Sequence, residues 1–282
     1  MELTLHAPAK VNLTLIVGTR RDDGYHDVST VMQTVGLYDT LTLSGGGSGL
    51  TMTCTDPDLP TDGSNLVLRA AALFCQELHL PVPDLHLHLQ KRIPSQAGLG
   101  GGSSDAAAVL RAMRTLYAPE VSDAELERMA AALGSDVPFF VRGGTTLATG
   151  RGERLTPLPR LADGWFVVVK PPEGFSTPAM YRRLDEPGSV LVRNSRYMQD
   201  AVAANNVHAV AAELHNSFER VAPKDSAVWV IREALRAQGA LAAMLSGSGS
   251  AVFGLFDRED AARAAAEVLR ARWPLTFAAQ PV

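Results

Sequence analysis

The sequence predicts an α+β protein with two domains. Segments with the two-residue period of strands alternate with segments that have the helical period. In the second half, strand, helix and strand follow one another, which is typical of a sheet covered by helices. Around 156–164 the composition turns to proline, leucine and turn residues, and a new apolar strand follows. We therefore expect an N-terminal domain at 1–156 and a C-terminal domain at 157–282.

The first expected element is a strand near the N-terminus. Every second residue of 11–17 is apolar, which places one face of this strand in the core. Lys10 and Asn12 fall on the opposite face, so their side chains are expected to project together. Strand-like runs follow at 31–35 and 40–43. The glycine-rich segment 45–49 then indicates either a hairpin or a surface loop.

Later elements follow from the same two periods. Helices are expected at 65–78, 104–117, 123–133, 201–221, 227–237 and 258–272, and strands at 85–89, 165–169, 241–245 and 251–256. Gly134 is placed to end the helix expected at 123–133. His86 and His88 share one strand face, and without a third ligand at metal spacing an exposed face is favoured over a metal site.

Composition excludes several classes of function. The chain has 282 residues and a net charge of −4, which argues against a nucleic-acid partner. Cys54 and Cys75 form no CxxC pair, so neither a disulfide framework nor a zinc site is predicted. Neither a secretory leader nor an apolar run of about 18 residues is evident. We expect a cytoplasmic protein without a membrane segment, either a monomer or a weak homodimer.

The strongest signal is a glycine-rich loop that leads into a helix. Residues 94–105 read PSQAGLGGGSSD, with four glycines in the five positions 98–102. Glycines let backbone N–H groups approach oxygen atoms closely, and a helix N-terminus attracts negative charge. A plain helix cap by Ser103, Ser104 or Asp105 is the alternative, but the glycines exceed what a cap needs. The loop therefore predicts a phosphate site.

Other nucleotide motifs are absent from the sequence. It contains no GxxxxGK[ST] motif, the GxGxxG register breaks at Ser103, and the HRD and DFG pair of protein kinases is missing. The loop has no lysine of its own, so positive charge must come from elsewhere. Lys10, Lys91 and Arg92 are the candidates.

Five segments, in this order, resemble the GHMP kinases. They are APAKVNL at 7–13, DGYH at 23–26, GLGGGSSDAA at 98–107, LGSDVPFFVRG at 133–143 and LSGSGSAVFG at 245–254. The resemblance implies an N-terminal domain of the ribosomal-protein-S5-like type and a C-terminal ferredoxin-like domain. It also implies a phosphotransferase that uses ATP, with Mg²⁺ delivered by the nucleotide rather than by a protein metal site.

Within that family, the segments are similar to the branch whose small-molecule substrate carries a cytidine diphosphate moiety. The implied reaction is phosphorylation of the 2-hydroxyl of 4-diphosphocytidyl-2-C-methyl-D-erythritol, a step of the non-mevalonate route to isoprenoid precursors. A homoserine or mevalonate-type kinase is one alternative. A nucleotide-binding module without turnover is another, and the presence of both Lys10 and Asp136 argues against it.

The resemblance also assigns roles to residues. Those expected at the nucleotide are Asn65, Leu66, Lys91, Pro94, Ser95, Gln96, Ala97, Gly98, Leu99, Gly100, Gly101, Gly102, Ser103 and Ser104. Those expected at the substrate are Asn12, Tyr25, His26 and Tyr181. Asp136 is expected to accept the hydroxyl proton, and Lys10 to hold that hydroxyl and counter charge.

Each of these residues also has a local interpretation. Asp136 precedes Val-Pro and fits the cap of a short helix, and Asn65 fits a helix cap as well. Lys10 fits a solvated strand lysine. The turn at 23–26 fits one packed by its own side chains.

Overall fold

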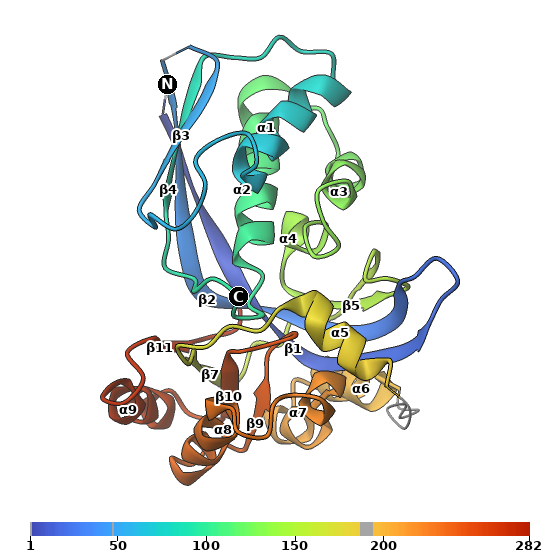
Figure 1. Ribbon diagram of the computed structural model, residues 1–282, viewed down its shortest axis with the longest axis vertical. Coiled ribbons are helices and arrows are strands. Elements are labelled where there is room, and N and C mark those ends of the chain that lie inside the picture. Colours follow the sequence, from blue (N-terminus) through green and yellow to red (C-terminus); the bar gives the residue numbers. More distant parts are fainter. Residues whose placement is uncertain (1, 47, 187–193) are drawn as a thin grey trace. The chain divides into compact units, whose positions relative to one another are not determined.

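The structure is a computed structural model that describes residues 2–46, 48–186 and 194–282 (Figure 1). The chain divides into two compact units, each assembled from separate segments. The first unit comprises Met1–Ala9, Leu37–Ile93 and Gly100–Gly143, and the second comprises Lys10–Gly36, Pro94–Leu99 and Gly144–Val282. Strands β1 (Glu2–Arg20) and β2 (His26–Gly45) run through both units. The domain boundary expected near residue 156 stays a prediction.

A sheet with helices on one side forms the first unit. Its strand order is β3-β4-β2-β1, where β4 (Leu85–Gln90) is antiparallel to β2 and β3 (Leu50–Cys54) is parallel to β4. The runs at 31–35 and 40–43 belong to one long strand, β2. Because β4 lies between β2 and β3, the segment that joins these two strands does not close a hairpin.

Four helices of this unit lie on one side of the sheet (Figure 1). They are α1 (Leu66–Glu77), α2 (Gly101–Tyr117), α3 (Asp123–Ala131) and α4 (Phe139–Arg142). On β4 the three leucines are buried, as the alternation predicts. His86 and His88 form hydrogen bonds with Thr51 and Thr53 on β3, which confirms that they belong to a polar strand face.

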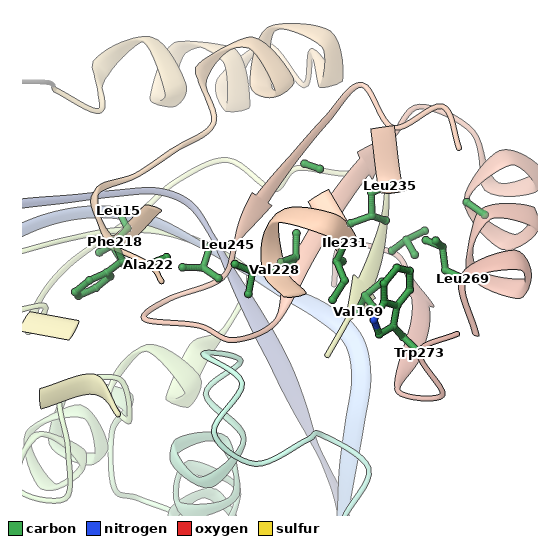
Figure 2. Packing of buried hydrophobic residues seen from close by; sticks show 14 of the residues in the cluster. Leu15, Val169, Phe218, Ala222, Val228, Ile231, Leu235, Leu245, Leu269 and Trp273 are labelled. Carbon is green, nitrogen blue, oxygen red and sulfur yellow. The ribbon is translucent and has the colours of Figure 1, made fainter. Parts of the chain in front are cut away.

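The second unit contains an antiparallel sheet of strand order β11-β7-β10-β9. Its strands are β7 (Trp165–Val169), β9 (Ala242–Leu245), β10 (Val252–Phe256) and β11 (Thr276–Ala279). Helices α8 (Ala227–Ala237) and α9 (Glu259–Arg270) contribute Ile231, Leu235 and Leu269 to a common apolar core with Val169 and Trp273 (Figure 2). Burial of these side chains is the main force that holds the unit together.

Shorter elements complete the second unit. They are β5 (Thr145–Thr149), β6 (Arg154–Pro157), α5 (Thr177–Leu184), α6 (Arg196–Ala203), α7 (Val207–Glu213), β8 (His215–Asn216) and the 3₁₀ helix η1 (Ser217–Arg220). β5 pairs with β2 and with β6. β8 runs parallel to β1, with His215 opposite Thr14.

The single helix expected at 201–221 is wrong, because α6, α7, β8 and η1 share this stretch. Asn205 has a positive φ of 48°, which ends α6, and the side chain of Asn206 caps α7 by accepting from the N–H of Ala209 at 3.1 Å. Asn216 does the same at η1, accepting from the N–H of Phe218 at 2.9 Å. Asparagine side chains compete for backbone hydrogen bonds and so interrupt helices.

The mixed helix and sheet content confirms the predicted α+β class. Cys54 and Cys75 are free thiols. Among the described residues, the helices are all too short or too polar to cross a membrane.

Candidate active site

The glycine-rich loop ends at a helix N-terminus whose backbone donors have no side-chain cap. Gly100 is the N-cap of α2, with a left-handed φ of 73°, and no acidic residue lies in the first turn. The interpretation of Ser103, Ser104 or Asp105 as the cap is therefore wrong. The first N–H groups of a helix have no acceptor within it, and the helix dipole favours negative charge there. The geometry fits a bound phosphate.

The glycines of this loop serve different purposes. At Gly98 φ is 72°, and an added Cβ would lie 2.0 Å from the carbonyl oxygen of Ser246. At Gly102 the nearest atom to an added Cβ is Leu66 Cδ1, at 3.8 Å. The fold itself therefore requires glycine at position 98 but leaves room at position 102. A ligand oxygen that approaches the backbone closely would explain why position 102 is glycine.

A second glycine-serine segment, 246–250, braces the start of the loop within the second unit. Ser246 Oγ donates to the carbonyl oxygen of Gly98 at 3.0 Å, and the N–H of Ala251 donates to the carbonyl oxygen of Ala97 at 3.1 Å. Asn216 holds the second segment, because its amide donates to the carbonyls of Leu245 and Gly247, each at 2.8 Å. Sequence reasoning missed Asn216, which lies inside the stretch predicted as a helix.

The other predicted loop residues differ in exposure. Ala97 and Leu99 are buried, Pro94 is half-buried, and Ser95 and Gln96 are exposed. Gln96 has a positive φ of 49°, and its carbonyl oxygen accepts from the N–H of Ser250 at 3.4 Å. The loop start is thus held by backbone hydrogen bonds and by the buried side chains of Ala97 and Leu99.

Lys10 is buried and hydrogen-bonded rather than solvated. Only 3% of Lys10 and 3% of Asn12 are exposed, and Lys10 Nζ donates to Asn12 Oδ1 at 2.6 Å. Asn12 Nδ2 in turn donates to Thr30 Oγ1 at 2.8 Å. The backbone N–H of Lys10 donates to the carbonyl of Leu99 at 2.9 Å, which ties β1 to the loop. The structure confirms that Lys10 and Asn12 project together.

His26 and Tyr181, both expected at the substrate, lie together in the second unit. Their rings stack with centroids 5.0 Å apart. Nε2 of His26 lies 2.7 Å from Oδ1 of Asp185, a residue that sequence reasoning missed. Tyr25 is 55% exposed, and the guanidinium of Arg151 lies 4.9 Å from its ring centre. The turn is therefore not packed only by its own side chains.

Lys91 lies in a buried cluster of charges in the first unit. Its Nζ donates to Asp39 and, at 2.9 Å, to Asp105 Oδ2. Asp39 also accepts from the N–H groups of Arg92 and Ile93. Two carboxylates thus surround one ammonium against the first turn of α2, where an added Cβ at Gly101 would lie 3.3 Å from Nζ. Contact between Lys91 and a nucleotide stays a prediction.

Burial shifts the titration of this cluster. Desolvation raises the pKa of Asp105 to about 7; Lys91 opposes the shift, and the nearby charge of Asp39 adds to it. Burial lowers the pKa of Lys91, but the charges of Asp105 and Asp39 outweigh burial and raise it above its ordinary value. Asp105 Oδ1 and Ser104 Oγ have no hydrogen-bond partner among the described residues. Sequence reasoning missed Asp39 and the pairing of Asp105 with Lys91.

The raised pKa of Asp105 predicts a pH-dependent stability. The folded-state pKa of about 7 exceeds the ordinary 3.8, so protonated Asp105 favours the fold. This contribution is complete below pH 4 and is lost as the pH rises through 7. The free energy of unfolding of the wild type, minus that of Asp105→Asn, should fall by about 3 kcal/mol between pH 5 and pH 8. Urea denaturation at several pH values measures it, and a pH-independent difference would contradict the shift.

Asn65 and Asp136 were both candidates for helix caps, and only Asn65 caps a helix. Asn65 Oδ1 accepts from the N–H of Val67 at 2.9 Å and caps α1, so the capping interpretation is confirmed. Leu66 begins that helix. Asp136 is half-buried between α3 and α4. Helix α4 starts after Pro138 without a side-chain cap, so Asp136 as its cap is wrong. The nucleotide role of Asn65 and the proton-accepting role of Asp136 stay predictions.

No group of three or more His, Cys, Asp or Glu residues in the described part of the chain could hold a metal ion. The start of α2 contains two hydroxyls, those of Ser103 and Ser104. Two isolated hydroxyls fit a cation that arrives with phosphate ligands of its own.

This fold and loop are those of a class of small-molecule kinases. Residues 65–144 match the family described as "GHMP kinases N terminal domain", and residues 198–275 match "GHMP kinases C terminal". The chain therefore belongs to the GHMP kinase family, which confirms the predicted resemblance and two-domain fold class.

Individual relatives are more specific. The chain is 38% identical to the 4-diphosphocytidyl-2-C-methyl-D-erythritol kinase of Desulfitobacterium hafniense, over 96% of this chain and 93% of the relative. It is 40% identical to the kinase of the same name from Geobacter sulfurreducens, over 96% of each chain. A crystal structure of 4-(cytidine 5'-diphospho)-2C-methyl-D-erythritol kinase is similar with a TM-score of 0.84 and 39% identity, and 99% of each chain is covered.

Proposed function

We propose that this chain transfers the γ-phosphoryl group of ATP to the 2-hydroxyl of 4-diphosphocytidyl-2-C-methyl-D-erythritol, giving ADP and the 2-phosphate. The uncapped N-terminus of α2, with room for an added Cβ at Gly102, is the observation that carries the proposal. Phosphoryl transfer depends mainly on positioning and on neutralisation of charge, and this helix end supplies both for a phosphate chain.

ATP would be held by the backbone N–H groups at the start of α2. The hydroxyls of Ser103 and Ser104 lie in the same turn and would bind a phosphate oxygen or a cation; Ser104 is only 1% exposed. Mg²⁺, when bound with the nucleotide, neutralises phosphate oxygens and orients the transferred group. Lys91 would act mainly by holding the first turn of α2 in place, because its ammonium already contacts the side chains of Asp39 and Asp105.

Lys10 and Asp136 would perform the transfer. Asp136 would accept the proton of the acceptor hydroxyl as its oxygen attacks the γ-phosphorus. The ammonium of Lys10, buried and held by Asn12, would stabilise the negative charge on the reacting oxygens. A buried ammonium acts more strongly than a solvated one, because little water screens it.

The turn that contains Tyr25 and His26 would bind the cytidine end of the substrate, together with Tyr181. Stacked and edge-on aromatic rings in this region offer flat surfaces for a base. We further expect the enzyme to act in the cytoplasm, as a monomer or a weak homodimer.

ADP release in the presence of ATP and Mg²⁺ tests the proposal. Three acceptors are compared in parallel, namely the cytidine-linked alcohol, homoserine and mevalonate, with an acceptor-free sample to measure hydrolysis. Turnover that requires the cytidine-linked alcohol is expected. Turnover with another alcohol would keep the kinase class and reject the substrate. ATP binding without turnover of any acceptor would favour the non-catalytic alternative.

A further inference from the structure

Asp185 is positioned to control the ring of His26. It is the C-cap residue of α5, one turn after Tyr181, and its N–H donates to the carbonyl of Tyr181 at 3.2 Å. Its Oδ1 lies 2.7 Å from Nε2 of His26, whose side chain is only 7% exposed. Its Oδ2 lies 3.9 Å from Arg20 Nη1. The main partner of the carboxylate is thus the imidazole.

The contact determines which ring nitrogen carries hydrogen. An ionised carboxylate only accepts hydrogen bonds, so Nε2 of His26 must be the donor to Asp185. In a neutral imidazole the other nitrogen, Nδ1, then has a free lone pair and accepts. Among the described residues, Nδ1 of His26 has no hydrogen-bond partner. One acceptor therefore remains on the ring for a ligand.

Aromatic packing fixes the direction in which this acceptor points. The ring of His26 stacks on Tyr181 with an interplanar angle of 28°. Tyr181 in turn meets the edge of Phe218 at a centroid distance of 4.9 Å. Phe218 is 1% exposed and belongs to the apolar core of the second unit (Figure 2). The ring is thus held by Tyr181, which packs against the core residue Phe218, and by Asp185 at Nε2.

We propose that Asp185 is a positioning residue that fixes the Nε2–H tautomer of His26 and thereby makes the enzyme select cytosine over uracil. Cytosine presents an exocyclic amino group, a donor, where uracil presents a carbonyl oxygen, an acceptor. An acceptor at Nδ1 pairs with the amino group and repels the carbonyl. The inference rests on the proposed function, in which His26 contacts the base.

The test is Asp185→Asn with two acceptors, the cytidine-linked alcohol and its uridine-linked analogue. Asparagine can either donate to Nε2 through its amide nitrogen or accept from it through its carbonyl oxygen, so it no longer fixes the ring hydrogen at Nε2 and weakens the preference for an amino group. We expect the ratio of kcat/KM for the cytidine substrate to that for the uridine substrate to fall about tenfold to one-hundredfold. Asp185→Ala should lower this ratio to a similar extent, because it also leaves both tautomers accessible.

Two control variants separate the effect of the His26 tautomer on base preference from a general effect of removing charge. Arg20→Gln removes the longer ion pair of Asp185 without changing the partner of His26. Asp27→Asn removes an acidic group next to His26 in sequence, one that pairs with Arg21 at 2.9 Å instead. Both variants should keep the wild-type ratio of the two kcat/KM values.

The outcomes of this experiment are distinct. If the wild type does not phosphorylate the cytidine-linked alcohol at all, the proposed function fails. If the wild type does so, but Asp185→Asn lowers kcat/KM for both substrates equally, Asp185 has only a structural role and the inference is wrong. A wild type that prefers the uridine analogue would also overturn it. A fall in the ratio confined to the Asp185 variants supports the inference.

Discussion

Asp136→Asn is expected to lower kcat by about two to four orders of magnitude, the usual contribution of a positioned general base. Asparagine has nearly the size of aspartate, but its amide cannot accept the hydroxyl proton as a carboxylate can. Asp136 does not cap α4, so its loss should leave the helix intact. Steady-state ADP release measures the rate, and calorimetric titration with ATP measures nucleotide binding, which should stay close to that of the wild type.

The matched control is Asp123→Asn in the same unit. Asp123 pairs with Arg114 at 2.6 Å, and this ion pair holds its pKa below the ordinary value. The control therefore removes an acidic side chain with a structural partner and should leave kcat near the wild-type value. Loss of ATP binding together with activity in Asp136→Asn would indicate a structural role and would contradict proton transfer.

Gly98→Ala is expected to destabilise the protein by at least about 3 kcal/mol, from a left-handed backbone and a steric clash. The clashing atom is the carbonyl oxygen of Ser246, which cannot rotate away as a side chain can. Relief requires that the segment 246–250 move away from the loop, with the loss of the hydrogen bond from Ser246 Oγ. Urea denaturation measures the change in the free energy of unfolding.

Gly102→Ala is the matched variant in the same loop. An added Cβ there meets only Leu66 Cδ1 at 3.8 Å, so stability should stay near that of the wild type. ATP affinity should fall by about tenfold or more, because the methyl group occupies the space through which a phosphate would approach the backbone. Equal stability of the two variants would refute the argument from Gly98, and unchanged ATP affinity in Gly102→Ala would refute the phosphate site.

Periodicity predicted most of the longer elements. The expected segments at 165–169 and 227–237 coincide with β7 and α8, because strong apolar patterns there match the buried faces. The pattern failed at 201–221, where three asparagines divide an apolar stretch. β11 was missed because its burial does not alternate: Thr276 and Ala279 are buried, and the two residues between them are half-buried.

For the site, the sequence revealed the residues that lie in motifs and missed those that support them. Gly98 and Lys10 were found because they belong to short patterns with a clear chemical meaning. Asp39 and Asp185 were missed because each meets its partner only in the fold. Asp39 is 52 positions from Lys91, and Asp185 is 159 positions from His26. No local pattern marks a carboxylate whose partner lies so far away in the chain.

Phosphorus NMR of the product formed from ATP and the cytidine-linked alcohol tests the central claim most directly. A new phosphomonoester signal is expected, with phosphorus–carbon coupling that identifies C2 as the phosphorylated carbon, with the diphosphate of the substrate unchanged and ADP formed in equal amount. Formation of inorganic phosphate instead, with the alcohol recovered intact, would show that the chain hydrolyses ATP without transfer and would contradict the proposed function.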